Sequence, residues 1–383
     1  MQTKTRALTV ALAAGLAAPA FGQTDIFWNA GSGVWNAPGN WNPVNVPNAT
    51  SENAFILSPA FAEVTLDISA SIGSLEVGPQ MTLSQNPSTT LFMHGNITNN
   101  GFITLNPTTN NGNATIQFNT SSTISGNGIL RLSGGNNDAA ITSNGTVVTN
   151  ALGHTIDGAG QIVATFINDG VVSAIDSGFG NRLELVSGTK TNNLNMQAGP
   201  GAELFLSGVT VNQIPGATIA ANSGGTVIFN GSNTINGGRL VGPGTFLKPT
   251  SGNLTLSDVS VEQDIDVAPA AGIFYNSDTL NCTGTITLND SDSGANSFIQ
   301  FNASTTVSGG GTFFLAGSGN DSQVTTNGTI LTIEPGFTIE GSGEIPATLI
   351  NNGLVRAFPS ANGDGRLDLF AGTKTNNALI RAD

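Results

Sequence analysis

Basic residues are the scarcest charged type in this sequence. Its 383 residues include 11 Lys and Arg but 25 Asp and Glu, which gives a formal net charge of −14 at neutral pH. Loss of Lys4 and Arg6 with the signal peptide predicted below would make the net charge −16. Phosphate groups are bound by clusters of Lys and Arg. The charge balance therefore argues against nucleic acid and anionic membrane surfaces as partners.

The chain has one cysteine and two histidines, too few for a disulfide framework or a histidine metal site. Cys282 cannot form an internal disulfide, and its neighbours alternate in strand fashion, which predicts a buried and unreactive thiol. His94 and His154 lie sixty residues apart. Phe337 takes the place of His154 in the repeat described below, so we expect a half-buried packing position for this histidine rather than a catalytic one.

No segment after the first residues approaches the roughly 18 consecutive apolar residues of a membrane-spanning helix. Residues 1–22 have the features of a secretory signal peptide. Lys4 and Arg6 precede an alanine-rich apolar stretch, and small residues offer a cleavage site after Ala20 or Gly22. We therefore expect a secreted or cell-surface protein with no transmembrane segment in this chain.

Glycine and asparagine are abundant, with 50 and 44 residues, although only 9% of all residues are charged. Both types tolerate the positive φ angles of tight corners. Between the corners, short runs such as residues 115–119, 203–207 and 253–257 alternate polar and apolar side chains. No stretch after the signal peptide has a helical apolar period. The pattern predicts an all-β protein made of many short strands.

A long internal repeat indicates how these strands are arranged. Residues 103–198 align with residues 286–382, and about half of the aligned positions are identical. Residues 188–193 return unchanged as residues 372–377. Within each copy a smaller unit recurs, in which an apolar residue and one polar residue precede Gly-x-Gly. Nested repeats of this kind indicate a solenoid, because one coil of short strands cannot bury its apolar side chains without a neighbour.

The sequence therefore predicts a single-stranded right-handed parallel β-helix over residues 60–383, preceded by a tryptophan-rich capping segment at residues 23–59. At a spacing of about 4.8 Å between coils, about 12–16 coils would form a rod of roughly 60–75 Å. Asparagines at equivalent corners are expected to form hydrogen-bonded ladders along the rod. Closed barrels and sandwiches are the competing all-β folds, but they explain the nested copies less well.

Two features carry a family resemblance. They are the passage from Phe27 to Trp41 with the following Val46-Pro47-Asn48, and the series of Asn-x-Gly-x-Ile/Val coils. Together they resemble β-helical exported surface proteins of bacteria, related to autotransporter passengers and to planctomycete-type proteins with sorting tails. The resemblance implies a right-handed β-helix at the cell surface or outside the cell, but no reaction. The sequence departs from that family because neither a translocator barrel nor a sorting tail is recognised after the second copy, so whether the chain is a fragment and how it is anchored stay open.

The three tryptophans Trp28, Trp35 and Trp41 lie within fourteen residues and are the only ones in the protein. One hypothesis is an aromatic platform that stacks on sugar rings. The other is an end cap, in which the large rings close the apolar end of the tube while their indole N–H groups bond outward. The position at the start of the predicted solenoid favours the cap.

Calcium is the ligand that the acidic residues suit best. Asp290 and Asp292 alternate before a glycine, and the segment with Asp364 and Asp368 resembles the middle of a calcium-binding loop. That second segment lacks acids at the first and last positions of such a loop, and the first copy has no acid where Asp290 lies. These carboxylates are therefore interpreted first as solvated turns, with calcium ligands as the alternative.

Enzymes of the pectin-lyase type also use β-helices, and their chemistry needs converging carboxylates or carboxylate-bound calcium with a basic side chain. Candidates in the second copy are Arg356, Asp364, Arg366, Asp368 and Lys374. The pair Asp368 and Lys374 has counterparts in the first copy, Glu184 and Lys190. A pair that is present in both copies predicts a surface ion pair beside a turn rather than catalysis.

The leading hypothesis is a non-catalytic extracellular structural or adhesive protein that contacts polysaccharide or neighbouring cells. The alternative is a polysaccharide-active or carbohydrate-binding β-helix. An enzyme should gather several ionisable side chains of mixed sign on one face of adjacent coils, beside long loops. A structural rod should instead disperse its acids over a uniform polar face.

Overall fold

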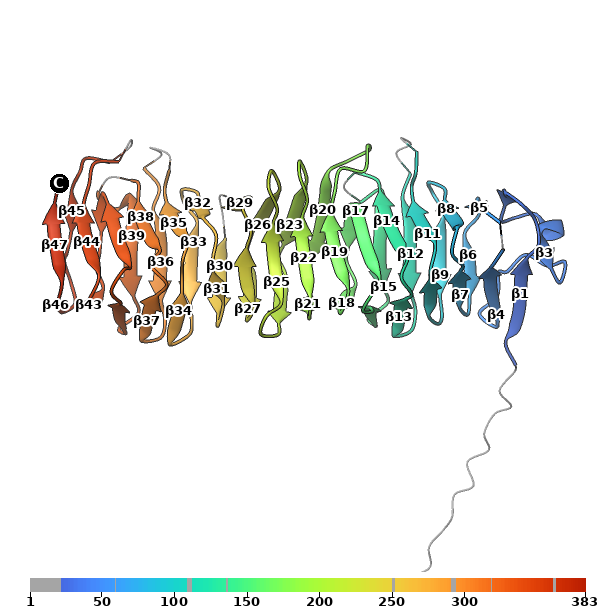
Figure 1. Ribbon diagram of the computed structural model, residues 1–383, viewed down its shortest axis with the longest axis horizontal. Coiled ribbons are helices and arrows are strands. Elements are labelled where there is room, and N and C mark those ends of the chain that lie inside the picture. The colour runs from blue at the N-terminus through green and yellow to red at the C-terminus, as the bar shows by residue number, and fades with distance from the viewer. Residues whose placement is uncertain are drawn as a thin grey trace, which may run out of the picture.

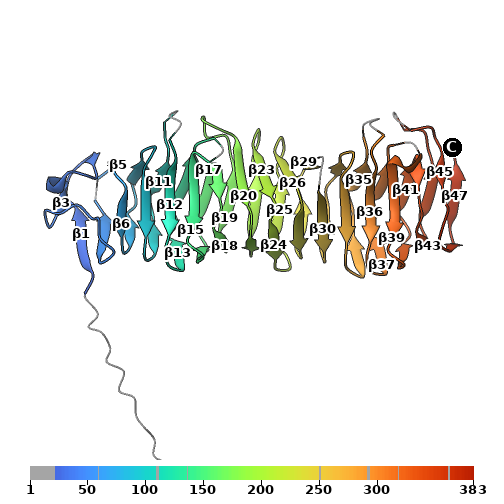
Figure 2. The ribbon, with the colours of Figure 1, turned by 180° about the vertical axis from the view of Figure 1, so that it is seen from behind.

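The protein is an all-β rod in which short strands wind around one axis (Figures 1 and 2). The structure is a computed structural model and describes residues 22–58, 60–108, 112–135, 137–249, 252–290, 294–317, 319–360 and 363–383. It is 54% strand and 2% helix and forms a parallel β-solenoid of about 14 turns. The predicted solenoid and the predicted number of coils are confirmed, whereas the signal peptide lies almost wholly outside the described residues.

Each turn carries three short strands, one on each of three faces. The strands of the first face are β1 (Thr24–Trp28), β3 (Trp41–Asn42), β4 (Glu52–Ile56), β7 (Leu75–Val77), β10 (Ile97–Asn99), β13 (Ser122–Ser125), β16 (Val147–Asn150), β18 (Thr165–Asn168), β21 (Thr189–Asn192), β24 (Thr210–Gln213), β27 (Asn233–Asn236), β30 (Asn253–Ser257), β33 (Gly272–Tyr275), β36 (Ser297–Phe301), β39 (Ser322–Thr326), β42 (Gly343–Glu344) and β45 (Leu367–Asp368).

The strands of the second face are β2 (Gly33–Val34), β5 (Ala62–Leu66), β8 (Met81–Gln85), β11 (Phe102–Leu105), β14 (Ile129–Ser133), the first half of β17 (Thr155–Ile162), β19 (Val171–Ala174), β22 (Asn195–Ala198), β25 (Thr218–Ala221), β28 (Arg239–Val241), β31 (Ser260–Val261), β34 (Thr279–Asn281), β37 (Thr305–Ser308), β40 (Ile330–Ile333), β43 (Thr348–Asn351) and β46 (Lys374–Asn376). A parallel bridge between Val261 and Cys282 joins its two parts, β2–β31 and β34–β46.

The strands of the third face are β6 (Ala70–Ile72), β9 (Thr90–Met93), β12 (Ala114–Phe118), β15 (Ala139–Ser143), the second half of β17, β20 (Arg182–Val186), β23 (Glu203–Ser207), β26 (Thr226–Asn230), β29 (Thr245–Lys248), β32 (Ile265–Val267), β35 (Thr285–Leu288), β38 (Thr312–Leu315), β41 (Thr338–Gly341), β44 (Leu354–Ala357) and β47 (Leu379–Ala382). Two short 3-10 turns, η1 (Pro38–Asn40) and η2 (Gly319–Asp321), lie outside the three faces.

Inward side chains form continuous apolar ladders, because each strand pairs in register with the strand one turn later. One ladder on the third face joins residues with no exposed surface, namely Leu183, Leu204, Val227, Phe246, Ile265, Ile286, Phe313, Ile339 and Val355. Burial of one such side chain is worth about 1.5–3 kcal/mol relative to its exposure. The core is therefore one unbroken column and contains no separate globules.

The two copies of the repeat are consecutive lengths of this column, but they occupy different faces. Ile116 lies in β12 on the third face, and its counterpart Ile299 lies in β36 on the first face, both fully buried. In the same way, Ile124 in β13 of the first face corresponds to Val307 in β37 of the second. The offset between the copies is thus a whole number of turns plus one third of a turn, which the sequence repeat alone did not predict.

The sequence placed the start of the solenoid at residue 60, but parallel strand pairing already begins before that residue. β1 pairs in parallel with β4, and β4 with β7, so both strands already belong to the coil. β3 folds back and pairs antiparallel with β1, with Trp41 opposite Trp28. This short strand covers part of the first strand edge and acts as a cap on the pairing.

A ladder of buried amides runs beside the apolar core, as the sequence predicted. Asn150 donates from Nδ2 to the Oδ1 atom of Asn168 at 2.9 Å, Asn168 to Asn192 at 3.0 Å, and Asn192 to Gln213 at 2.9 Å. Each asparagine also donates to a backbone carbonyl of the following turn, such as Val171 O for Asn150. The amides thus satisfy the corner carbonyls that would otherwise be buried without a partner.

His154 lies against the first amide of this ladder. Its Nδ1 is 2.7 Å from Asn150 Oδ1, and its Nε2 is 3.1 Å from Asn99 Nδ2. Because the Asn99 amide donates, Nε2 must accept and Nδ1 must carry the proton, so both bonds require the neutral ring. Burial lowers the pKa of His154 to about 4. The side chain is fully buried, not half-buried as the sequence suggested.

The second copy replaces this whole polar group with apolar residues. The counterparts of Asn99, Asn150 and His154 are Cys282, Ile333 and Phe337, and all three are fully buried. The Cys282 thiol is buried, as predicted, and burial raises its pKa to about 12, which disfavours the reactive thiolate. The same corner is thus built once with hydrogen bonds and once with apolar packing.

We expect the neutral His154 to make stability depend on pH. The unfolded chain binds a proton near the ordinary pKa of 6.5, whereas the folded chain does so only near 4, so the free energy of unfolding should fall as the pH drops through this window. Urea denaturation of the His154→Phe variant should lack this part of the decrease. At pH 7 the His154→Phe substitution should lower the free energy of unfolding by about 1–3 kcal/mol, because Asn150 Oδ1 loses its donor. Adding Asn150→Ile should recover part of this loss.

His94→Phe is the matched control, because the half-buried ring of His94 lies 3.2 Å from the Asn119 amide and outside the ladder. This control should keep the pH dependence of the parent protein. An unchanged pH dependence in the His154→Phe variant would contradict the assignment of the neutral ring.

Candidate functional site

The three tryptophans gather at the N-terminal end of the rod, as the sequence predicted. The Trp41 ring lies edge-on between Trp28 and Trp35, with centroids 4.9 and 4.8 Å apart. Their indole N–H groups donate to the carbonyl oxygens of Gly31, Trp35 and Pro47 at 2.8–3.1 Å. All three tryptophans are buried, with exposed fractions of 4% for Trp28, 0% for Trp35 and 1% for Trp41.

This burial gives the tryptophans the geometry of an end cap. A sugar ring stacks on an exposed aromatic face, and none of the three indoles offers one, so the sugar-contact hypothesis finds no support at these residues. Phe27 at this end is 42% exposed, and its ring stacks on that of Phe55 at a centroid distance of 4.9 Å. The sequence did not identify these phenylalanines as candidate contact residues.

The predicted calcium ligands belong to two separate segments. Asp290 lies between β35 and β36, whereas Asp368 lies in β45. On the first face, β39 and β42 separate β36 from β45, so the two segments lie on different turns of the rod. Asp368 forms an ion pair with Arg366 at 2.7 Å, and Asp364 accepts the backbone N–H of Arg366 at 3.0 Å. Asp292 lies outside the described residues. Calcium binding at these residues stays a prediction.

The candidate catalytic residues fall into separate groups, because Arg366 contacts Asp364 and Asp368 whereas Arg356 and Lys374 have other partners. Arg356 pairs across the coils with Glu340 on one side and with Asp383, at 3.4 Å, on the other. Arg366 is exposed and engaged with Asp368, and Lys374 points to backbone carbonyls. Arg356, Arg366 and Lys374 are thus each engaged with different partners.

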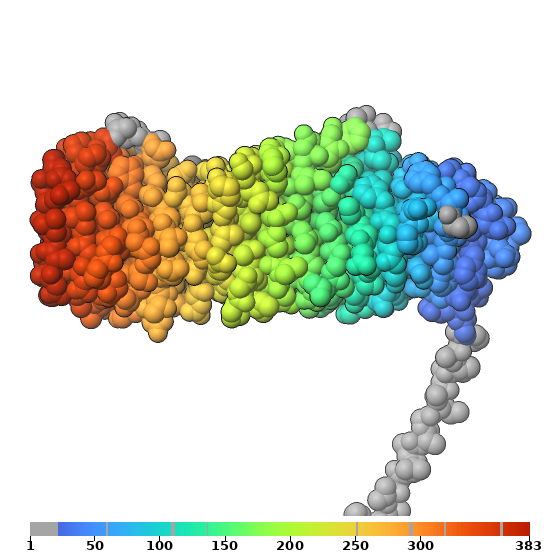
Figure 3. Space-filling model, in the orientation of Figure 1, coloured from blue at the N-terminus to red at the C-terminus, as the bar shows by residue number. Residues whose placement is uncertain are grey.

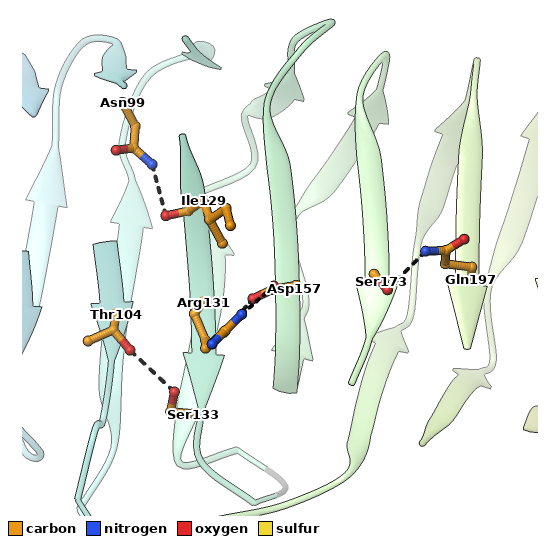
Figure 4. A network of polar contacts seen from close by, with 8 residues as sticks. All are labelled: Asn99, Thr104, Ile129, Arg131, Ser133, Asp157, Ser173 and Gln197. Atoms are coloured by element: carbon orange, nitrogen blue, oxygen red, sulfur yellow. Dashed lines mark hydrogen bonds and ion pairs between the residues drawn. The ribbon is translucent and has the colours of Figure 1, made fainter. Parts of the chain in front are cut away.

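Charged pairs also join neighbouring turns elsewhere on the rod. Arg131 makes a bidentate pair with Asp157 at 2.7–2.8 Å, and Figure 4 shows it bridging two adjacent strands. The same view shows a bond from Gln197 to Ser173 further along the rod (Figure 4). Such exposed or half-exposed pairs contribute little stability individually. They place the arginine of each pair beside a carboxylate of a neighbouring turn.

Lys190 and Lys374 do not form the surface ion pairs with Glu184 and Asp368 that the sequence predicted. The Nζ atom of Lys190 is buried and donates to four backbone carbonyls, among them Ala164 O at 2.9 Å and Ser187 O at 2.7 Å. Lys374 repeats the arrangement with Ala347 O at 2.7 Å. A corner that leaves several carbonyls pointing inward needs a multiple donor, which the ammonium group supplies. The repeated Gly-Thr-Lys motif is therefore structural.

The described surface has several hollows, and two of them draw most of their residues from residues 199–285, which belong to neither copy. The outline of the rod narrows over the yellow segment in this region (Figure 3). The larger hollow, of about 570 Å³, crosses the corners after β24, β27 and β30 and is lined in part by Asn212, Asn236 and Arg239. The smaller hollow, of about 330 Å³, lies near the ends of β29 and β32.

The smaller hollow brings ionisable groups of both signs together on adjacent coils. It is lined by Lys248, Asp266 and Asp290 together with two prolines. Burial and the nearby Asp290 raise the pKa of Asp266, and burial lowers the pKa of Lys248 to about 8. Lys248 is inward and fully buried, whereas Asp266 pairs with the outward Leu247, so the two side chains leave opposite sides of the sheet.

Sequence reasoning missed both hollows. The signal that could have located the larger one is the Gly237-Gly238 pair, which places a corner without side chains between two ordinary corners. The inward position of Lys248 follows from strand alternation, but a lysine is normally assigned to the surface.

Among the described residues, no three His, Cys, Asp or Glu side chains form a cluster that could hold a metal ion. The described part of the chain also contains no helix with the length and apolar character needed to cross a membrane. Comparisons with protein-family models, with curated proteins and with solved structures found no match.

We expect Lys190→Met to destabilise the solenoid without changing its shape. Methionine fills the space of the lysine stem but leaves the carbonyls of Ala164 and Ser187 without a donor, so the free energy of unfolding should fall by about 1–3 kcal/mol. Lys374→Met is the matched control, because the carbonyls around Lys374 are partly exposed and water can replace the ammonium group. Chemical denaturation measures both, and an equal loss in the two variants would contradict the buried carbonyl site.

Proposed function

We propose that this protein is a non-catalytic extracellular rod with a structural or adhesive role, which contacts polysaccharide or neighbouring cells. The observation that carries the proposal is the dispersal of charge into pairs between adjacent turns, such as Arg131 with Asp157 and Arg239 with Glu262. Acid–base catalysis needs convergent ionisable groups, and these pairs spread such groups along the rod.

The mechanical character of the fold supports a role in projection or spacing. About 14 turns at roughly 4.8 Å per turn give a rod of roughly 65–70 Å. Its core is a continuous column, and its corners are tied by the buried amides of Asn150, Asn168 and Asn192. Such a rod holds its two ends and its side surface at fixed distances, which suits a protein that displays a binding surface.

Export and the family resemblance belong to the same proposal. The signal peptide features of residues 1–22 and the likeness to autotransporter passengers and to planctomycete-type surface proteins support a location outside the cell. The excess of acidic over basic residues makes nucleic acid an unfavourable partner.

A polysaccharide-active protein is the second candidate, and the smaller hollow favours it. Asp266 has a raised pKa and lies near Asp290 on adjacent coils, an arrangement related to the carboxylate pairs that act on glycosidic bonds. A lyase would need a basic side chain on the same side of the sheet as these carboxylates, and Lys248 points to the other side, into the core.

A glycan array with the full secreted chain, run with and without calcium, tests the proposal together with an assay for chain cleavage. We expect binding to some polysaccharides and no release of new chain ends from them. Release of chain ends that the Asp266→Asn variant abolishes would establish the second candidate instead. Absence of binding to any glycan or to whole cells would contradict the adhesive role.

A further inference from the structure

The larger hollow exists because one corner lacks side chains. Gly237 and Gly238, between β27 and β28, both have positive φ angles of 74° and 71°. A Cβ atom on Gly237 would lie 2.4 Å from Gln213 O, and one on Gly238 would lie 2.7 Å from Gln213 Cβ. Neither position can therefore accept a side chain. The neighbouring corners carry Pro215 and Asp258, which form the two walls.

The lining offers hydrogen-bonding groups that are already held in place. Asn236 donates from Nδ2 to Asn212 Oδ1 at 2.8 Å, which leaves Asn212 Nδ2 and Asn236 Oδ1 without a hydrogen bond in the described part of the chain. Arg239 is fixed by two bonds to Glu262 at 2.6 and 2.7 Å. Ser260 adds a hydroxyl group beside them. Groups held in this way lose little conformational entropy when a ligand binds.

The charge of the groove disfavours an anionic ligand. The Arg239 guanidinium is neutralised by Glu262, the Asp258 carboxylate adds a further negative charge, and the chain as a whole carries −14. Amide, hydroxyl and paired guanidinium groups instead suit the hydroxyl groups of a neutral ligand, each as donor or acceptor. Pro215, with the neighbouring exposed Ile214, supplies an apolar surface for C–H groups.

We propose that this groove is a binding subsite for one extended, uncharged glycan chain lying along the rod. The assignment rests on the proposed function, which it narrows to a site and a ligand class. The three corners that form the groove succeed one another at roughly 4.8 Å, a distance comparable to the length of one sugar unit in an extended chain. Successive sugar units thus meet equivalent positions of successive corners.

The length of the groove predicts how affinity depends on chain length. Cello- and manno-oligosaccharides of two to six units are suitable neutral probes, and oligogalacturonate is the anionic comparison. In calorimetric titrations the affinity for a neutral probe should rise up to about three units, since three coils at roughly 4.8 Å line the groove, and should then level off. Stronger binding of oligogalacturonate than of every neutral probe would overturn the assignment.

Two variants test the location of the site. Ser260→Trp should fill the groove and weaken binding at least about tenfold, whereas Thr312→Trp should not. Thr312 is a suitable control because the first copy carries the large residue Ile129 at the same position. Circular dichroism and the melting temperature confirm that both variants are folded.

Asn212→Ala is a second, smaller change that keeps the surface open. It removes the amide that faces the groove and should weaken binding several-fold. Asn276→Ala is its control, because Asn302 donates to Asn276 at 2.9 Å in an equivalent amide pair outside the groove. Wild-type binding in both Ser260→Trp and Asn212→Ala would overturn the site while leaving the adhesive function intact. Failure of the wild-type protein to bind any glycan would overturn the site, and failure to bind whole cells as well would also overturn the adhesive function.

Discussion

The structure depends on one constraint, namely that an inward side chain is buried only when the next turn covers it. No single turn has a core of its own, and Phe246 is enclosed because Val227 and Ile265 lie directly before and after it in register. Buried polar groups obey the same rule. The amide of Asn168 finds its partners on the next turn, and the ammonium group of Lys190 takes two of its four carbonyl partners from the preceding turn. Stability, order and polar satisfaction are therefore all properties of contacts between turns.

This dependence explains what could be predicted from the sequence. Alternating apolar residues and Gly/Asn corners recur in every turn, so the solenoid, its number of coils and its amide ladder followed from local pattern. The one-third-turn offset between Ile116 and Ile299 did not, because the three faces carry the same alternation. The burial of Lys190 was also missed, since the backbone carbonyls that accept its protons have no signature in the sequence.

The candidate site was hidden for a different reason. The groove is produced by side chains that are absent at Gly237 and Gly238, and its walls come from corners about twenty residues away on either side. Only the register of the coils brings Asn212 and Asn236 together. The residues that did stand out from the sequence, the tryptophans and the acidic turns, are largely engaged in capping or in local pairs.

The offset of one third of a turn between the two copies indicates how a solenoid of this kind can be lengthened. Because any face can take over the pattern of any other, the tube can be lengthened by a single strand and corner instead of a complete circuit. Each such insertion turns everything beyond it by a third of the circumference. The same surface feature can in this way face any of three directions around the rod.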